Sequence, residues 1–306
     1  SKGAALILLS AWSMAIIPGS GWLTGSLWGP AAIGFFSGTP ALQGVIEFDA
    51  WWKAMLVPSA VLSLLFILGL YRVMKPSGDL KIDREAFRAE LKSLGVMSFK
   101  EKTTFTILLA TFLLLVTGRI HGVPDVAVCL GAFALLAACG IIEARDIGTG
   151  ISWDFVLFIG SIMGFGLIFQ ETGVASFLNH SFHPVITALA GNLWVLTYAM
   201  LVLFFILRFV DVPQLFCTIP FVVPFLPMLA TDFHIHPLVF VFLFIMGGNC
   251  FFLAYQQAFV ILGETVAGRA AWTPTQLLQA GIIFFFACLV TLAISLLYWK
   301  AVGMVT

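Results

Sequence analysis

Two opposite charges lie close together in a stretch that is otherwise apolar enough for a membrane interior. Arg208 and Asp211 are three residues apart, and Val212 and Pro213 follow them directly. A charge at the bilayer centre costs about 3 kcal/mol or more, so such a residue usually faces a cavity or a partner. Proline breaks a helix and frees carbonyl groups that can bind an ion. These four residues therefore indicate ion binding or ion coupling.

The surrounding residues give this stretch two interpretations. Apolar arms flank it on both sides, which predicts the tip of a re-entrant hairpin over about 185–229. The alternative is a short polar loop that joins two full spans and leaves both charges in water.

Two further apolar runs are interrupted by short polar stretches. Pro18–Gly21 interrupts the first run, whose fourteen apolar residues before the break span about 21 Å. That is short of the roughly 30 Å hydrocarbon core, which favours a helix broken at mid-depth over two separate spans. A Pro-Gly kink made for packing alone is the alternative. Ala254–Gln257 interrupts the second run, over 238–268, in the same way.

Broken helices in membranes line binding cavities, and the positive end of a half-helix suits an anion. We therefore predict a substrate site between the two breaks. Its candidate binding residues are Gly19, Ser20, Gly21, Thr24, Gly25, Ser26, Tyr255, Gln256 and Gln257.

The composition places these residues in a membrane protein. The 306 residues are 61% hydrophobic and 10% charged, with a mean hydropathy of +1.07. Apolar runs of eighteen or more residues recur, which predicts an all-α polytopic protein in a lipid bilayer. The net charge of zero argues against nucleic acid as a partner. The five cysteines lie in apolar runs without metal-ligand spacing, so we predict no metal site and no bound cofactor.

The elements that must position these residues are full spans around the breaks and the hairpin. The predicted spans are Trp51–Tyr71, Phe105–Thr117, Val123–Ile142, Trp153–Leu178 and Leu277–Trp299. The span over Trp51–Tyr71 has aromatic residues at both ends, which we expect at the membrane interfaces.

A hydrophilic connector over 72–102 holds thirteen of the thirty charged residues, eight of them basic. Phe87, Leu91 and Leu94 recur at helical spacing, which predicts an amphipathic surface helix over Asp83–Leu94. Basic excess marks the cytoplasmic side, and the resulting topology places eleven basic residues inside and three outside. We expect a multi-pass protein of a bacterial-type inner membrane or a plasma membrane, with this connector in the cytoplasm.

Residues 1–71 and the end of the chain share one pattern: a broken helix, a polar loop containing Trp, and a full span. The first copy starts inside and the second starts outside. Inverted copies of a broken helix are typical of secondary transporters. We therefore divide the chain into the end of a first repeat over 1–71, the connector over 72–102 and a second repeat over 103–306.

Several stretches resemble the divalent anion/sodium symporter family, which carries di- and tricarboxylates or sulfate. Residues 17–26, Ile-Pro-Gly-Ser-Gly-Trp-Leu-Thr-Gly-Ser, are similar to the family's glycine- and threonine-rich loop in its first broken helix. Residues 46–58, Lys100-Glu-Lys-Thr, Ile151-Ser-Trp153 and Glu171-Thr-Gly173 resemble further family segments. The resemblance implies eleven spans, two re-entrant hairpins and a dimer.

This chain departs from the family pattern in ways that bear on coupling. The first three spans, the first hairpin and the next helix have no counterpart, so we expect a homodimer or a partner chain that supplies the missing first half. The chain begins Ser-Lys-Gly and enters an apolar segment at once, as a fragment would. At the second hairpin tip, Asp211-Val-Pro213 stands where the family's Ser-Asn-Thr would bind sodium and substrate. Either Na⁺ or H⁺ remains as the coupling ion, since Asp211 can ligand a cation or carry a proton.

Three functional hypotheses follow. The first is secondary active transport of a small anion, either a di- or tricarboxylate or a sulfate-like ion, and it predicts a polar cavity between the breaks. The second is a non-transporting structural or accessory membrane subunit of the same fold, and it predicts apolar packing there. The third, an intramembrane enzyme, has little support because Pro18-Gly-Ser-Gly21 only partly matches a serine-protease motif. We expect no enzyme activity.

Overall fold

The computed structural model contains helices and, in the residues that it describes, no strand. Contacts divide the chain into two compact units, residues 1–79 with 159–306 and residues 80–158. The described residues are 2–26, 28–37, 39–75, 84–151, 153, 156–157, 160–161, 164, 168, 171–211, 218–257, 260, 263 and 272–306, without the side chains of 37, 84, 86, 87, 119, 175, 179 and 220.

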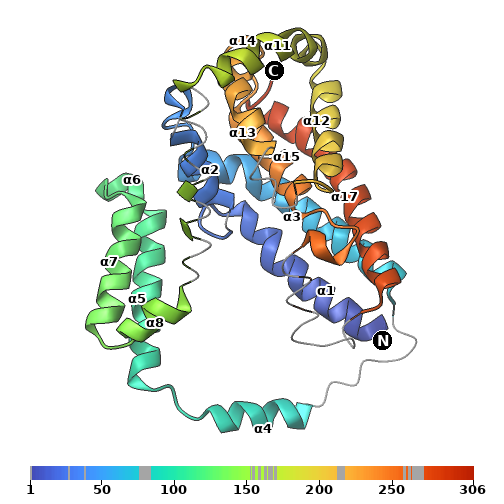
Figure 1. Ribbon diagram of the computed structural model, residues 1–306. Coiled ribbons are helices and arrows are strands. Elements are labelled where there is room, and N and C mark those ends of the chain that lie inside the picture. Colours follow the sequence, from blue (N-terminus) through green and yellow to red (C-terminus); the bar gives the residue numbers. More distant parts are fainter. Residues whose placement is uncertain are drawn as a thin grey trace. The chain divides into compact units, whose positions relative to one another are not determined.

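Two long antiparallel helices, α3 (Phe48–Val73) and α17 (Pro274–Ala301), lie side by side in the first unit (Figure 1). Pro58 has no amide hydrogen, so the carbonyl of Ala54 loses its intrahelical donor. The indole Nε1 of Trp299 donates to this Ala54 carbonyl at 2.8 Å. A proline that would weaken α3 is thus compensated by a side chain of α17.

The first broken helix is present, but its second half starts later than predicted. Helix α1 (Lys2–Ile16) ends before a 3₁₀ turn, η1 (Pro18–Gly21), and α2 (Trp28–Ser37) begins only at Trp28, not directly after Gly21. Residues 22–26 form turns instead. The cause is a close backbone approach within the loop, because a Cβ on Gly19 would lie 2.6 Å from the carbonyl oxygen of Gly25.

The predicted first hairpin arm is divided by a turn at Gly191–Asn192. Helix α11 (Val174–Ala190) ends there, and α12 (Leu193–Leu207) starts with Asn192 as its N-cap. The Asn192 Oδ1 accepts the backbone N–H groups of Trp194 and Val195. The arm expected from 185 therefore begins at 193, because an asparagine side chain satisfies the first free amides of a new helix.

Three short helical elements follow the predicted tip: α13 (Thr218–Val222), η3 (Val223–Phe225) and α14 (Leu226–Asp232). The second broken helix starts as α15 (Pro237–Asn249), which is buried along its whole length. It stops at Cys250 and is followed by a 3₁₀ turn, η4 (Ala254–Gln256). Most of 258–271, where the prediction resumes the helix, lies outside the described residues.

Aromatic side chains fill the centre of this unit between α1, α3, α17 and the second break. The ring centroids of Trp12 and Phe251 are 5.0 Å apart, and those of Phe66 and Phe284 are 5.3 Å apart. Phe66, Phe251 and Phe284 are fully buried. Aromatic rings that meet edge to face bury a large apolar area in a favourable geometry.

The second unit contains α4 (Arg84–Leu94), α5 (Phe99–Val116), α6 (Gly118–His121), α7 (Asp125–Ala138) and α8 (Ala144–Gly150). Helices α5 and α7 form an antiparallel pair (Figure 1). Ser98 and Glu101 cap α5 reciprocally, and Lys100 Nζ donates to the carbonyl of Gly140 at 2.9 Å. The predicted surface helix over Asp83–Leu94 is present as α4, with Leu91 and Leu94 exposed.

Three helical stretches of the described residues are long and apolar enough to cross a membrane: Lys2–Gly21, Phe48–Val73 and Pro274–Ala301. Large apolar side chains are exposed along α5, α7 and α12, as lipid-facing helices require. The structure therefore fits the predicted all-α polytopic membrane protein. Most of the span predicted over Trp153–Leu178 lies outside the described residues.

Candidate functional site

Two helices of the first unit run in the same direction and end at the same place. Phe204 of α12 stacks on Phe244 of α15 with centroids 4.5 Å apart, and Phe209 lies on Phe252 at 5.9 Å. The paired residues stay about forty positions apart, so the two helices are parallel. Their carboxyl ends, each carrying carbonyls without intrahelical donors, are therefore brought together.

Arg208 lies at this meeting point and is only 4% exposed. Its Nε donates to the carbonyl of Cys250 at 3.1 Å, and its Nη2 donates to the carbonyl of Gln256. Carbonyls at a helix C-terminus carry partial negative charge and attract a cation. Arg208 is thus held in an apolar unit because it satisfies the backbone that the second break exposes.

Asp211 is also 4% exposed, and its carboxylate contacts Thr218. Its Oδ2 accepts the backbone N–H of Thr218 at 2.9 Å and the Thr218 hydroxyl at 3.0 Å. The carboxylate therefore caps the start of α13. Val212 and Pro213, the other two residues predicted for ion coupling, lie outside the described residues.

The second break is closed by its own glutamine. Gln256 is fully buried, and its Oε1 accepts the backbone N–H groups of Phe252 at 2.7 Å and Leu253 at 3.0 Å. Its Nε2 has no hydrogen-bond partner among the residues that the structure describes. A buried amide donor without a partner costs about 1–3 kcal/mol, so this nitrogen marks a place where an acceptor is missing.

The neighbouring residues of the second break divide between the interior and the surface. Gln257 is 5% exposed, and its Nε2 donates to Asn249 Oδ1 at 3.5 Å. Asn249 in turn donates to the carbonyl of Ile245 at 2.9 Å. Tyr255 is 48% exposed, so the structure places it on the surface of the unit and separates it from the two glutamines.

The first break is tied to α3 by a neutral hydrogen bond. The indole Nε1 of Trp51 donates to the carbonyl of Ser20 at 3.0 Å, and the Ser20 hydroxyl donates to the carbonyl of Ile17 at 2.6 Å. Gly21 lies against Ser59 of α3, whose Oγ would be 2.6 Å from a Cβ at that glycine. A side chain at position 21 would therefore push the break away from α3.

The rest of the first break is more open. Thr24 and Gly25 are exposed, whereas Ser26 is partly buried. The Ser26 hydroxyl is itself buried and has no hydrogen-bond partner within the described part of the chain. Each break therefore carries one buried donor that its own protein surroundings leave unsatisfied.

The structure brings Arg208, Gln256 and Gln257 into one buried cluster at the second break. The described contacts of the first-break residues run to α3 instead, and Trp12 of α1, the helix before the first break, contacts Phe251 beside the second break. Reasoning from sequence missed Asn249, Thr218, Trp51 and Ser59. Only Asn249 carried a usable signal, as an amide in the apolar run after Leu238.

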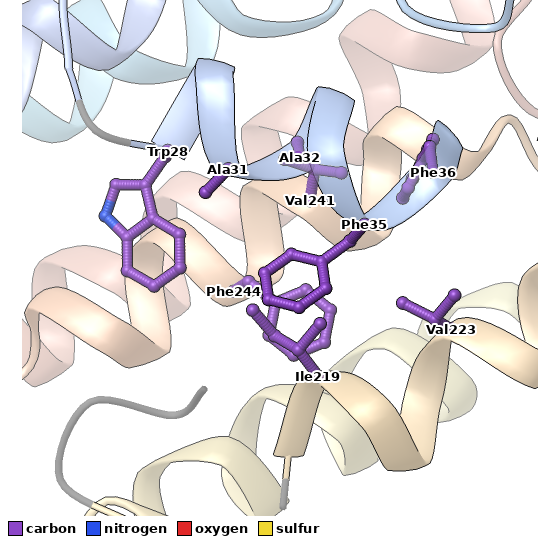
Figure 2. Close-up of a pocket in the computed structure, with 9 residues that line it drawn as sticks. All are labelled: Trp28, Ala31, Ala32, Phe35, Phe36, Ile219, Val223, Val241 and Phe244. Carbon is purple, nitrogen blue, oxygen red and sulfur yellow. The ribbon is translucent and has the colours of Figure 1, made fainter. Parts of the chain in front are cut away.

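A pocket near the breaks is apolar. It has a volume of about 20 Å³ and lies between α2, α13 with η3, and α15 (Figure 2). That is room for one water molecule, but a buried water needs two to four polar partners and the lining offers only the indole of Trp28. A larger apolar groove of about 680 Å³ runs between α11, α12 and the α13–α14 segment.

The family model described as the sodium:sulfate symporter transmembrane region matches residues 2–305. The chain belongs to this family. The match confirms the resemblance to the divalent anion/sodium symporters and identifies an integral membrane protein from a family of anion transporters. A comparison with curated proteins gave no match. In this symporter-family chain, the buried charged and amide side chains of the described residues are Arg208, Asp211, Asn249, Gln256 and Gln257, which lie around the second break and the end of α12.

Proposed function

We propose that this chain moves a small anion, a di- or tricarboxylate or a sulfate-like ion, across a membrane by secondary active transport. The substrate site comprises the second break with Gln256 and Gln257, and the first break with Ser20 to Ser26. Family membership and the buried polar cluster in a membrane-spanning unit support this proposal.

The observation that carries the proposal is the unpartnered Nε2 of Gln256. Its surroundings already balance one positive charge, Arg208, against the carbonyls of the break. What remains unsatisfied is a hydrogen-bond donor, and an anion supplies the acceptor oxygens that a donor needs. The unpartnered hydroxyl of Ser26 at the first break has the same requirement.

The lengths and directions of the helices support the transporter architecture. Helix α12 has 15 residues and is about 22 Å long, short of the roughly 30 Å core, as a re-entrant arm would be. The spans that follow the two breaks, α3 and α17, are antiparallel, as inverted repeats require. We infer a cytoplasmic connector over 72–102 and an assembly with a second copy or a partner chain.

The apolar pocket of Figure 2 favours a second candidate, an accessory subunit that has lost transport. In this alternative the second half of the first broken helix packs dry against the hairpin and α15. The two candidates differ in what they require of Gln256. A transporter needs its amide donor, whereas an accessory subunit needs only the Oε1 that closes the break.

The substitution Gln256→Glu separates these roles. A glutamate keeps an oxygen that accepts the amides of Phe252 and Leu253, so the break stays closed. It replaces the unpartnered donor by an acceptor and introduces a negative charge that repels an anion. We expect initial uptake of radiolabelled sulfate, succinate or citrate into proteoliposomes to fall at least about tenfold, a loss of about 1.4 kcal/mol in binding.

The matched control is Gln276→Glu in α17. Gln276 Oε1 also accepts a backbone amide, that of Thr273, but at the start of α17 and not within a break. This variant should transport like the wild type. Wild-type vesicles that take up none of the three anions under a sodium or proton gradient would contradict the transport proposal, as would equal uptake by the two glutamate variants.

A further inference from the structure

The guanidinium of Arg208 occupies backbone positions that resemble a cation site. Its Nε contacts the carbonyl oxygen of Cys250, at the end of α15, and its Nη2 contacts that of Gln256, within the second break. Both carbonyls belong to backbone that no longer follows the α15 helix. Two donors from one planar side chain therefore connect the end of α15 to the interruption.

Carbonyls at the carboxyl end of a broken helix are also the usual ligands of a free coupling cation. Unwound carbonyls and half-helix C-termini coordinate Na⁺ in transporters, because they present oxygen atoms with partial negative charge. At this break the ends of α12 and α15 contribute such charge together. This negative charge favours a positive group, and the chain provides one as the guanidinium of Arg208.

The remaining acidic group near the break does not create a second place for sodium. Asp211 Oδ2 accepts two hydrogen bonds from Thr218, which direct this oxygen to the start of α13. Gln256 Oε1 is likewise engaged by two backbone amides. Among the described residues, these two side-chain oxygens and the two carbonyls bound by Arg208 are thus committed to protein donors, a set that does not fit a free sodium ion.

We propose that Arg208 is a tethered cation that takes the place of a free sodium ion at the second break. The family description names sodium as the coupling ion, and this break departs from it. The replacement of sodium by Arg208 does not depend on the proposed transport function, but its consequence for coupling does. If the chain transports an anion, it needs no sodium at the second break, and the fixed guanidinium provides part of the positive field that holds the anion.

The test measures ion-dependent stability, which does not require transport. The thermal unfolding midpoint of the detergent-purified chain is followed by tryptophan fluorescence in sodium, guanidinium or choline chloride at equal ionic strength, each at about 20 mM. Removing the side chain by Arg208→Ala vacates the carbonyls. We expect sodium or guanidinium to raise the midpoint of this variant by about 3 °C or more beyond any rise in the wild type, since ligands that bind only the folded state stabilise it.

Two further variants sharpen the result. Arg208→Lys keeps a tethered cation, so it should gain no additional response to sodium. Arg145→Ala removes an exposed arginine in α8 and should respond as the wild type does. If Arg208→Ala aggregates in choline chloride, recovery of a monodisperse size-exclusion peak in sodium or guanidinium chloride counts as the expected rescue. Arg208→Gln, which carries a neutral hydrogen-bond donor, is measured in the same three salts.

Equal responses of wild type and Arg208→Ala to all three salts would overturn the tethered-cation proposal. So would Arg208→Ala and Arg208→Gln variants that aggregate to the same extent in each salt, since Arg208 would then be needed for packing only. Uptake by the wild type is measured in parallel. Failure of that uptake counts against the transport proposal alone, because the salt responses are read without it.

Discussion

The two breaks interrupt similar apolar helices but are held by different chemistry. At the first break, a neutral indole of Trp51 donates to the carbonyl of Ser20, and the loop leaves Thr24 exposed. At the second break, a buried guanidinium donates to two carbonyls, and Gln256 fills the loop from inside. The first break is bound to α3, and the second is bound to Arg208 at the end of α12.

This difference indicates that the two ends of the proposed site differ in their source of positive charge. A neutral tie leaves the first break without a permanent charge, so any coupling cation would have to bind there or at residues outside the described ranges. The charged tie at the second break makes α12 and α15 move together, because separating them would strand a buried guanidinium, at a cost of about 3–5 kcal/mol. The comparison can be tested at each break in turn.

The largest expected effect is at the contact between α17 and the second break. A Cβ on Gly281 would overlap the backbone carbonyl oxygen of Phe251, and neither the helix nor the charged break can shift. We expect Gly281→Ala to lower the free energy of unfolding by about 3 kcal/mol. The measurement is the thermal midpoint in detergent.

The matched variant for the first break is Gly29→Ala. A Cβ there overlaps the carbonyl of Leu23 just as closely, but Leu23 belongs to a local turn that can move. This substitution should cost roughly 1 kcal/mol. An equal loss at the two glycines would show that both breaks are equally rigid and would remove the contrast between them.

An effect smaller than that of Gly281→Ala is expected from Trp51→Phe, which deletes the hydrogen bond between α3 and the first break. The Ser20 carbonyl would lose its buried donor, which costs about 2 kcal/mol. The loop should also loosen, so a cysteine placed at Thr24 should react faster with a maleimide. Trp52→Phe is the control, because Trp52 is 42% exposed and its ring contact with Trp22 can be kept by phenylalanine. Unchanged labelling in Trp51→Phe would mean that the loop is held by its own turns.

Local patterns predicted the helices better than their ends. The span expected over Trp51–Tyr71 is α3, Phe48–Val73, because a long apolar run between polar loops has one solution in a membrane. The restart of the first broken helix at Trp28 was missed because the approach of Gly19 to Gly25 is a tertiary feature of the loop. Asn192 was a visible N-cap signal that the apolar run around it concealed.

The partners of the site residues were less predictable than the residues themselves. Arg208 and Gln256 could be chosen because a charge and an amide are out of place in apolar runs. Their partners are backbone carbonyls and amides, which carry no sequence signature. Trp51 was expected at the membrane interface from its place at the end of an apolar run. Its full burial and its bond to a carbonyl 31 residues away in the chain could not be predicted from that pattern.

The smallest expected effect concerns the other end of the second broken helix, where α15 is capped by His236. Its Nδ1 accepts the backbone N–H of Leu238, and its backbone N–H donates to the carbonyl of Met304. Burial, and then the nearby charge of Lys53, lower the pKa of His236 below its ordinary value of 6.5. The imidazole accepts this hydrogen bond only in its neutral form, so below pH 6.5 it gains a proton when the chain unfolds.

The sign of the resulting pH dependence follows from proton binding. Between the lowered pKa and 6.5 the unfolded chain binds more protons at this site than the folded chain, so stability rises with pH in that window. The contribution of His236 should be complete above pH 6.5 and decline as the pH falls below it. His236→Asn keeps a side-chain acceptor for the cap and cannot titrate. If the thermal unfolding midpoint falls with acid equally in wild type and His236→Asn, the pH response belongs to another group. Arg208 at the break would then be the ionisable residue that holds the second broken helix.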